Sequence, residues 1–145
     1  MIVQAAPIDH HEWLISRSGF APTKHLKCIE AVDRTGKIQG MIGYDGWTES
    51  SVQLHQAVDS PIAWRSLIHP GFEYPFVQCN RTILIGLTPS RNQRAIEMNR
   101  RLGFKETYRI KDACSIGEDM VLFEMRRADC RWLHAAKYLD EGVSP

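Results

Sequence analysis

The chain has 145 residues, 43% of them hydrophobic, and this length suits one domain with a single sizeable core. Its formal net charge of +1 lacks the basic bias of a nucleic-acid surface, so we expect no nucleic acid as a partner. No apolar run is long enough to span a bilayer and no export signal is visible, so we expect a cytoplasmic protein without membrane contacts.

The cysteines and histidines give no metal-binding pattern. The cysteines are widely spaced and include no C-x-x-C pair, which argues against a zinc site and favours reduced thiols. His10 and His11 are adjacent on a predicted helix, where their side chains point about 100° apart, so we expect solvated residues and no metal. The four cysteines are Cys28, Cys79, Cys114 and Cys130.

The first part of the chain predicts a strand, a short helix and an antiparallel meander. Pro7 ends the first strand, and glycines at the turns after Asp33 and Asp45 separate the meander strands. In the third meander strand, His55 is predicted on the face opposite Val52 and Leu54, and one face of the meander should cover the core. The predicted strands are residues 2–5, 27–33, 38–44 and 51–58, and the helix is residues 8–16.

The second part alternates helices and strands. Ser60 and Pro61 mark a helix start, and Pro70-Gly71 should break that helix. The predicted helical segments are 62–68, 72–80 and 128–139, the predicted strands are 82–87, 106–110 and 120–125, and residues 139–145 should fray. This order favours one α+β domain over residues 1–145, with a single mixed, largely antiparallel sheet and helices on both faces.

Residues 81–104 carry the most informative pattern. A buried β-branched strand is followed by Ser90 and Gln93, which match a capping box, and Gly103 supplies the left-handed end of the helix. Asn92, Ala95 and Asn99 fall on one stripe of that helix, together with Ile96. Buried amides need partners. Two interpretations stay open: the amides face a ligand, or Asn92 caps a loop and Asn99 is half exposed.

The pattern Asn92-x-x-Ala95-Ile96-x-Met98-x-x-x-Leu102-Gly103-Phe104 resembles the GNAT superfamily of acyl-CoA-dependent N-acetyltransferases. The order of predicted elements coincides with that of the family. Residues 103–125 look like the branch that includes ribosomal-protein N-terminal acetyltransferases, and residues 126–133 are reminiscent of phage-borne and proteobacterial GNAT-like proteins.

The resemblance implies acetyl-CoA as co-substrate, bound between the strand ending at Val58 and the strand ending at Leu87, which splay apart in the family. The free backbone of Ala57 and Val58 would pair with the pantetheine arm. The helix stripe of Asn92, Ala95 and Asn99 would wall the same site. Arg65 would add a charge-assisted contact to phosphate at the following helix.

Two departures from the family pattern stand out. The glycine-rich signature Q/R-x-x-G-x-G/A is absent, and bulky Ile62 and Trp64 occupy its place. Asn99 stands where many members place a tyrosine that protonates the thiolate, so solvent or Tyr108 would have to do so. As general base we name His55, with Glu49 behind it. The alternative for His55 is a surface residue on the open face of the sheet.

The resulting function is an N-acetyltransferase that acts on an amine, either a small molecule or a protein N-terminus. The alternative is a GNAT-shaped binding or structural protein without catalysis, as a homodimer or in a phage particle. The aromatics of residues 72–76 would then mark an interface.

Overall fold

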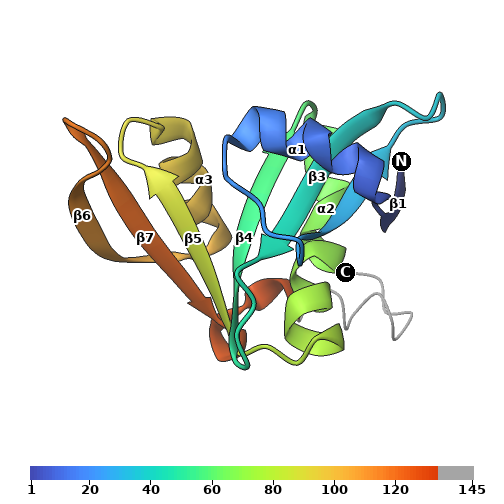
Figure 1. The fold of residues 1–145 in the computed structure, drawn as a ribbon. Coiled ribbons are helices and arrows are strands. Elements are labelled where there is room, and N and C mark those ends of the chain that lie inside the picture. The colour runs from blue at the N-terminus through green and yellow to red at the C-terminus, as the bar shows by residue number, and fades with distance from the viewer. Residues whose placement is uncertain (134–145) are drawn as a thin grey trace.

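One seven-stranded mixed sheet organises the described part of the chain, residues 1–133 of a computed structural model (Figure 1). The strand order is β1-β2-β3-β4-β5-β7-β6, and every neighbouring pair is antiparallel except β4 and β5, which are parallel. The α+β prediction is therefore confirmed. The strands are β1 (Ile2–Ala5), β2 (Lys27–Val32), β3 (Ile38–Asp45), β4 (Ser51–Val58), β5 (Ile83–Pro89), β6 (Lys105–Ser115) and β7 (Glu118–Arg126).

Helices cover the sheet unevenly. The helices are α1 (His11–Ser18), α2 (Pro61–Glu73) and α3 (Gln93–Leu102), with short helical turns at η1 (Ile8–His10), η2 (Tyr74–Gln78) and η3 (Arg127–Asp129). Leu14 of α1 packs with Met41, whereas Leu67 of α2 packs with the next residue of β3, Ile42. Because successive strand residues point to opposite faces, α1 and α2 lie on opposite faces of the sheet.

Helix α3 shares the face of α2, because its Ile96 belongs to the same buried cluster as Leu67. The predicted meander of β2, β3 and β4 is present, but the prediction that only one of its faces covers the core is wrong. Both faces are buried, one under α1 and the other under α2. Among the described residues, α3 is the helix that packs on the β5–β7–β6 part of the sheet, on the face of α2 (Figure 1).

The prediction that Pro70-Gly71 breaks the second helix is wrong. Helix α2 runs through both residues and continues directly into the π-helical turn η2. A side chain at position 71 would approach Ile42 Cδ1 to 2.5 Å, so Gly71 permits close contact of helix and sheet. The Tyr44 hydroxyl donates to the Gly71 carbonyl over 2.6 Å. Tertiary packing here overrides the local signal.

Several other sequence expectations are corrected. Phe72 and Phe76 are 3% and 0% exposed, so these aromatics belong to the core and are not an interface. His11 is buried and His10 Nδ1 lies 2.7 Å from Glu30 Oε1, so neither is simply solvated. Strand β6 is longer than predicted, and the second half of the helix predicted at 128–139 lies outside the described residues.

The four cysteines are free, and no three His, Cys, Asp or Glu residues in the described part of the chain group to hold a metal ion. No helix within residues 1–133 is long and apolar enough to cross a membrane.

Candidate active site

The sheet divides between β4 and β5. These parallel strands pair at only three positions, Ser51 with Ile83, Val52 with Leu84 and Gln53 with Ile85. Beyond this point β4 stays paired with β3 and β5 with β7, so the two strands diverge as a V (Figure 1). The facing backbone edges have no ladder partner in each other and can accept an extended ligand. The prediction that the two strands splay apart is confirmed.

A cavity of about 150 Å³ lies in this gap. Its walls come from α1, β4, β5, α3 with its N-cap, and Phe104. The cavity brings together four of the residues singled out from the sequence: His55, Asn92, Ala95 and Asn99. The remaining lining residues are Arg17, Ser18, Leu54, Gln56, Gly86, Leu87, Thr88, Pro89 and Phe104.

Helix α3 forms one wall and begins later than predicted. Asn92 is its N-cap, and the Asn92 side chain accepts from Ala95 N over 3.1 Å. The predicted capping box is wrong, because Ser90 Oγ instead accepts from Asp119 N over 2.9 Å, which ties Ser90 to β7. Asn92 thus caps its own helix and also faces the cavity.

Asn99 is buried, not half exposed, with 8% of its surface accessible. Its Nδ2 donates to Thr88 Oγ1 of β5 over 3.0 Å. The amide therefore holds α3 against β5 at the cavity wall. A carboxamide has no acidic proton at neutral pH, so Asn99 cannot supply a proton to a leaving group.

His55 lies on the α1 side of the gap. Its ring stacks on Phe20, with ring centroids 3.8 Å apart and an interplanar angle of 2°. Burial lowers the pKa of His55 from 6.5 to about 4, against the opposing charge of Asp45. The imidazole is therefore neutral at physiological pH and can accept a hydrogen bond or a proton. The surface alternative for His55 is wrong, because the ring is half-buried.

The carboxylate near His55 is Asp45 and not Glu49. Glu49 is exposed in the β3–β4 turn, at the closed end of the V, and the strand from Ser51 to His55 alone is roughly 13 Å long. Asp45 is buried and accepts from Thr23 N over 2.7 Å, Thr23 Oγ1 over 2.5 Å and Gly46 N over 2.9 Å. These hydrogen bonds lower the pKa of Asp45 although burial opposes them.

Other predicted residues lie outside the cavity. Tyr108 is 66% exposed on β6, two strands beyond β5. Arg65 is exposed on α2, and Ala57 and Val58 pair with β3 at the end of β4. These residues do not line the cavity. Their cofactor and catalytic roles stay predictions.

The end of α1 contributes residues that sequence reasoning missed. The Arg17 guanidinium lies 3.7 Å from the Trp13 ring centroid and 3.4 Å from Asp59 Oδ2. Ser18 Oγ donates to Gln56 O over 3.3 Å, so it occupies a carbonyl of β4 at the gap. No local motif marks these residues, because their place depends on how α1 docks on the sheet.

Gln56 lines the cavity and has a buried side-chain acceptor without a partner among the described residues. This acceptor is Oε1, while Nε2 of the same amide lies 3.5 Å from Met98 Sδ. A buried carbonyl without a donor is costly, and a ligand that brings an N–H group to this atom would relieve that cost.

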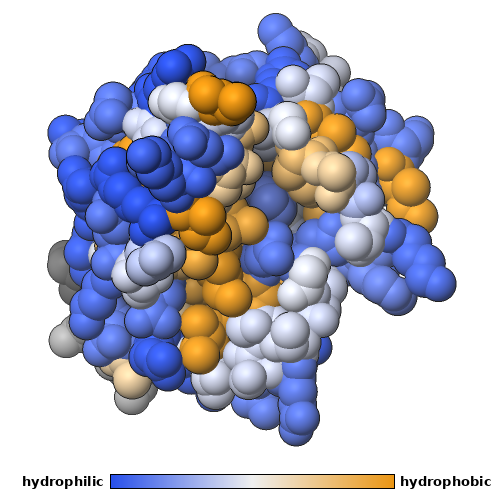
Figure 2. Space-filling view, turned by 60° about the vertical axis from the view of Figure 1, so that its left-hand side comes forward, coloured by the Kyte–Doolittle hydropathy of each residue, from blue (hydrophilic) through white to orange (hydrophobic). Residues whose placement is uncertain are grey.

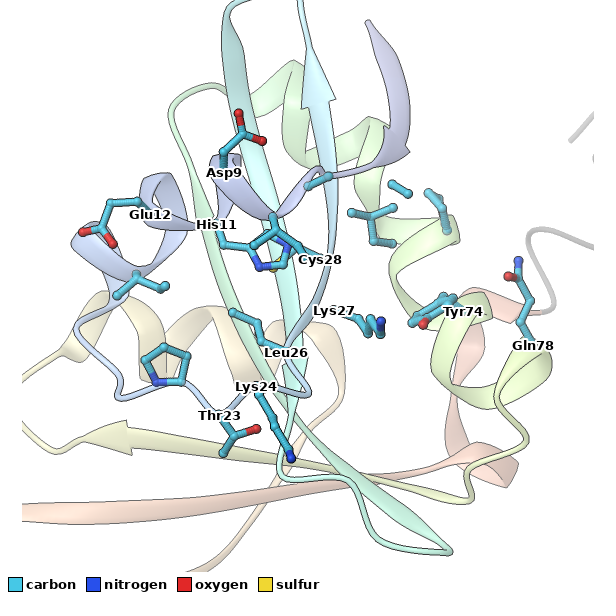
Figure 3. Close-up of a pocket in the computed structure, with 17 residues that line it drawn as sticks. Asp9, His11, Glu12, Thr23, Lys24, Leu26, Lys27, Cys28, Tyr74 and Gln78 are labelled. Carbon is cyan, nitrogen blue, oxygen red and sulfur yellow. The ribbon is translucent and has the colours of Figure 1, made fainter.

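A larger cavity of about 770 Å³ lies around the start of β2 (Figure 3). It shares no lining residue with the gap. Buried His11 and Cys28 lie at its wall, and burial raises the pKa of Cys28 to about 12, so this thiol stays protonated and unreactive. Asp9 and Glu12 lie at one end and Lys24 at the other (Figure 3).

Comparison with solved structures identifies the fold as that of GNAT acetyltransferases. A mutant form of the spermidine/spermine N-acetyltransferase SpeG from Vibrio cholerae matches with a TM-score of 0.72 and 12% identity, covering 97% of this chain and 98% of that one. A ribosomal-protein alanine acetyltransferase from Vibrio fischeri matches with a TM-score of 0.68 and 14% identity, covering 89% and 94%. No protein-family model and no curated protein matches the sequence.

Proposed function

We propose that this protein transfers an acetyl group from acetyl-CoA to an amine. The observation that carries the proposal is the V-shaped gap between β4 and β5, with a cavity inside it, in a fold shared with N-acetyltransferases. Acetyl-CoA would supply the acetyl group as a thioester. The protein's part is to hold that thioester beside a neutral amine and to provide a route for the proton.

The gap has features that suit a pantetheine arm. The free edges of β4 and β5 offer backbone partners, and Gln56 Oε1 offers a buried acceptor without a donor. Helices α2 and α3 begin after β4 and β5, with Ser60 and Asn92 as caps, and helix N-termini attract phosphate. The residues present therefore fit the cofactor, and Arg65 is free to add charge at α2.

The missing glycines are compatible with this arrangement. Ile62 is 57% exposed and directed away from the core, and Trp64 packs partly against the core cluster. Neither residue lines the cavity. The two bulky side chains therefore leave the gap open, although the α2 N-terminus lacks the close backbone approach that glycines permit.

His55 is the proton acceptor in this proposal. Its ring is neutral above about pH 5, since burial holds its pKa near 4. Such a weak base removes a proton only as the amine attacks and its acidity rises. The described lining residues include no acid for the thiolate, so solvent reaching the gap would protonate it.

The alternative function is a GNAT-shaped binding protein without catalysis. It is favoured by the small volume of the cavity and by Asn99, which is engaged with Thr88 and cannot act as an acid. The two functions differ in whether acetyl-CoA binds and in whether a thiol is released in the presence of an amine.

The test is a calorimetric titration with acetyl-CoA together with a thiol-release assay over a panel of amines. Ala95→Leu adds bulk to the cavity wall from a helix that tolerates leucine, and we expect at least a tenfold loss of affinity. Ala113→Leu, on exposed β6, is the matched control and should bind as the parent does. Absence of binding at millimolar acetyl-CoA would overturn the proposal. Binding without turnover of any amine would favour the non-catalytic alternative.

A further inference from the structure

An uncovered apolar surface begins at the gap. No helix of residues 1–133 covers the α1-side face of β5, β7 and β6 (Figure 1). On this face the register aligns Leu87, Leu122 and Tyr108 in one row across three strands. The next row is Pro89, Met120 and Ile110. We call these six residues the apolar platform.

The platform is accessible and continuous with the cavity. Tyr108 and Ile110 are 66% and 44% exposed, and the rest are half-buried. Leu87 and Pro89 belong both to the platform and to the cavity lining. When the β5–β7 side of the molecule comes forward, Figure 2 shows apolar side chains gathered along a hollow. With strands about 4.8 Å apart, the row from Leu87 to Tyr108 extends about 10 Å.

The ends of two helices give the two sides of the gap opposite electrostatic preferences. Helix α3 begins at the cavity on one face of the sheet, with Asn92 as its cap, and an N-terminus favours anions. Helix α1 ends at the cavity on the opposite face, at Ser18, where terminal carbonyls favour a cationic or hydrogen-bond-donating group such as an amine. The anionic cofactor is therefore favoured on the α3 side and the acceptor amine on the platform side.

The charges near the cavity oppose a polycation. Arg17 is the only charged residue among the described residues that line it, and no carboxylate lines it. The platform itself holds no charged side chain. A second ammonium group on the platform would lie on apolar side chains, where it loses hydration. At the cavity it would lie near the Arg17 guanidinium, whose repulsion is partly offset by Asp59 Oδ2 at 3.4 Å. Glu124, in the row beside Leu122 on the same face, lies 3.7 Å from Arg126 and is partly neutralised by it.

We infer that the acceptor is a primary amine on an apolar body of about 10 Å with no second positive charge, bound on the apolar platform, and that Arg17 disfavours polyamines. This inference rests on the proposed function for its chemistry. It differs from the activity named for the spermidine acetyltransferases that share the fold. A small arylalkylamine and a peptide N-terminus with apolar residues both have this chemistry.

The kinetic test compares three acceptors in the thiol-release assay: tryptamine, a leucine tripeptide amide and spermidine. We expect kcat/KM for tryptamine or the tripeptide to exceed that for spermidine at least tenfold. Whichever of tryptamine and the tripeptide has the higher kcat/KM shows whether the acceptor is a small amine or a peptide N-terminus. Arg17→Glu should raise kcat/KM for spermidine and so reduce the preference for the apolar amines over spermidine. Spermidine as the best acceptor would overturn the inference and leave the proposed function standing.

The positional test uses Leu122→Asp, which places a charge in the centre of the platform. We expect at least a tenfold rise in KM for the apolar amine and an unchanged KM for acetyl-CoA. Ile116→Asp is the matched control, since Ile116 is 93% exposed at the β6–β7 turn and outside the platform. Circular dichroism shows whether both variants fold. If Leu122→Asp turns a dimer into a monomer while acceptor kinetics stay unchanged, the platform is a contact between two copies and the inference is wrong.

Binding of the amine alone separates the two proposals. Saturation-transfer NMR with tryptamine, without acetyl-CoA, should show contact that Leu122→Asp abolishes and Ile116→Asp retains. If tryptamine binds in this way but acetyl-CoA does not bind, the proposed acetyl transfer is wrong and the apolar amine site still stands. Absence of tryptamine contact in the parent protein would overturn the inference.

Discussion

The two parts of the sheet on either side of the gap are built differently. Strands β2 to β4 are covered on both faces, by α1 and α2, whereas among the described residues β5, β7 and β6 carry helix α3 on one face. The difference coincides with the parallel pairing of the described sheet, where β4 and β5 diverge. A closed, helix-covered half thus holds the gap in place, and an open half gives access to it.

Glycines show how closely the first half is packed. A Cβ at Gly43 would lie 2.5 Å from Leu14 Cδ2 of α1, and a Cβ at Gly71 would lie 2.5 Å from Ile42 Cδ1. A Cβ at Gly86 in β5 would meet only Phe123 Cβ, at 3.4 Å, which is ordinary contact. The backbone of the first half therefore touches its covering helices, and that of the second half leaves room beside the gap.

The largest expected effect breaks the covered half. Leu14→Ala removes a fully buried side chain that fixes α1 on β3, and we expect a loss of about 2–5 kcal/mol in the free energy of unfolding. Leu122→Ala removes the same atoms from the half-buried platform, and the loss should be about 1 kcal/mol or less. Urea denaturation measures both. Equal losses would show that the two halves are equally covered.

A smaller effect concerns His55 at the boundary between the halves. The ordinary pKa of 6.5 applies to the unfolded chain and about 4 to the folded one, so between these values only the unfolded chain holds the proton. The free energy of unfolding should therefore fall as the pH drops from 6.5 to 4, by on the order of 3 kcal/mol. His55→Phe retains an aromatic ring against Phe20 but cannot be protonated. The fall in the free energy of unfolding between pH 6.5 and 4 should therefore be smaller in this variant, as measured by denaturation at several pH values.

His10→Gln is the matched control for this pH dependence. The hydrogen bond to Glu30 raises the pKa of His10, so its contribution is complete below pH 6.5 and lost as the pH rises through the raised value. His10→Gln should therefore lower the free energy of unfolding more at acidic pH than at alkaline pH. The fall caused by His55 should remain. An unchanged acidic limb in His55→Phe would mean that the imidazole is protonated in the folded protein.

Sequence reasoning reached the architecture because local signals and tertiary packing agree along most of the chain. Strand β4 begins and ends at the predicted residues, and the β-branched run before Pro89 is a strand as predicted. It is, however, buried on one face and half-buried on the other, and not covered on both faces as its apolar run predicted. Local signals misled where packing decides. Gly71 looks like a helix breaker but serves a close approach to Ile42, and β6 is an exposed edge strand whose sequence lacks a core-facing alternation.

The candidate site could be predicted only in part for a similar reason. His55, Asn92, Ala95 and Asn99 lie on elements with clear periodicity, so their faces could be assigned, and they meet at the cavity. Arg17 and Asp45 depend on the docking of α1 and of the Thr23 loop, which leaves no local trace. Glu49 was expected behind His55, but it lies in the β3–β4 turn, outside the strand that carries His55.

The smallest expected effect compares the caps of the helices that follow β4 and β5. Asn92 accepts from Ala95 N at α3, and Ser60 Oγ accepts from Ala63 N over 3.2 Å at α2. Asn92→Ala and Ser60→Ala should each lower the free energy of unfolding by about 1 kcal/mol, since each leaves a helix donor without its acceptor. Asn92→Ser keeps a neutral cap, so its stability should stay near that of the parent. If Asn92→Ser nevertheless weakens acetyl-CoA binding, the amide also contacts the cofactor; equal binding would limit Asn92 to its helix.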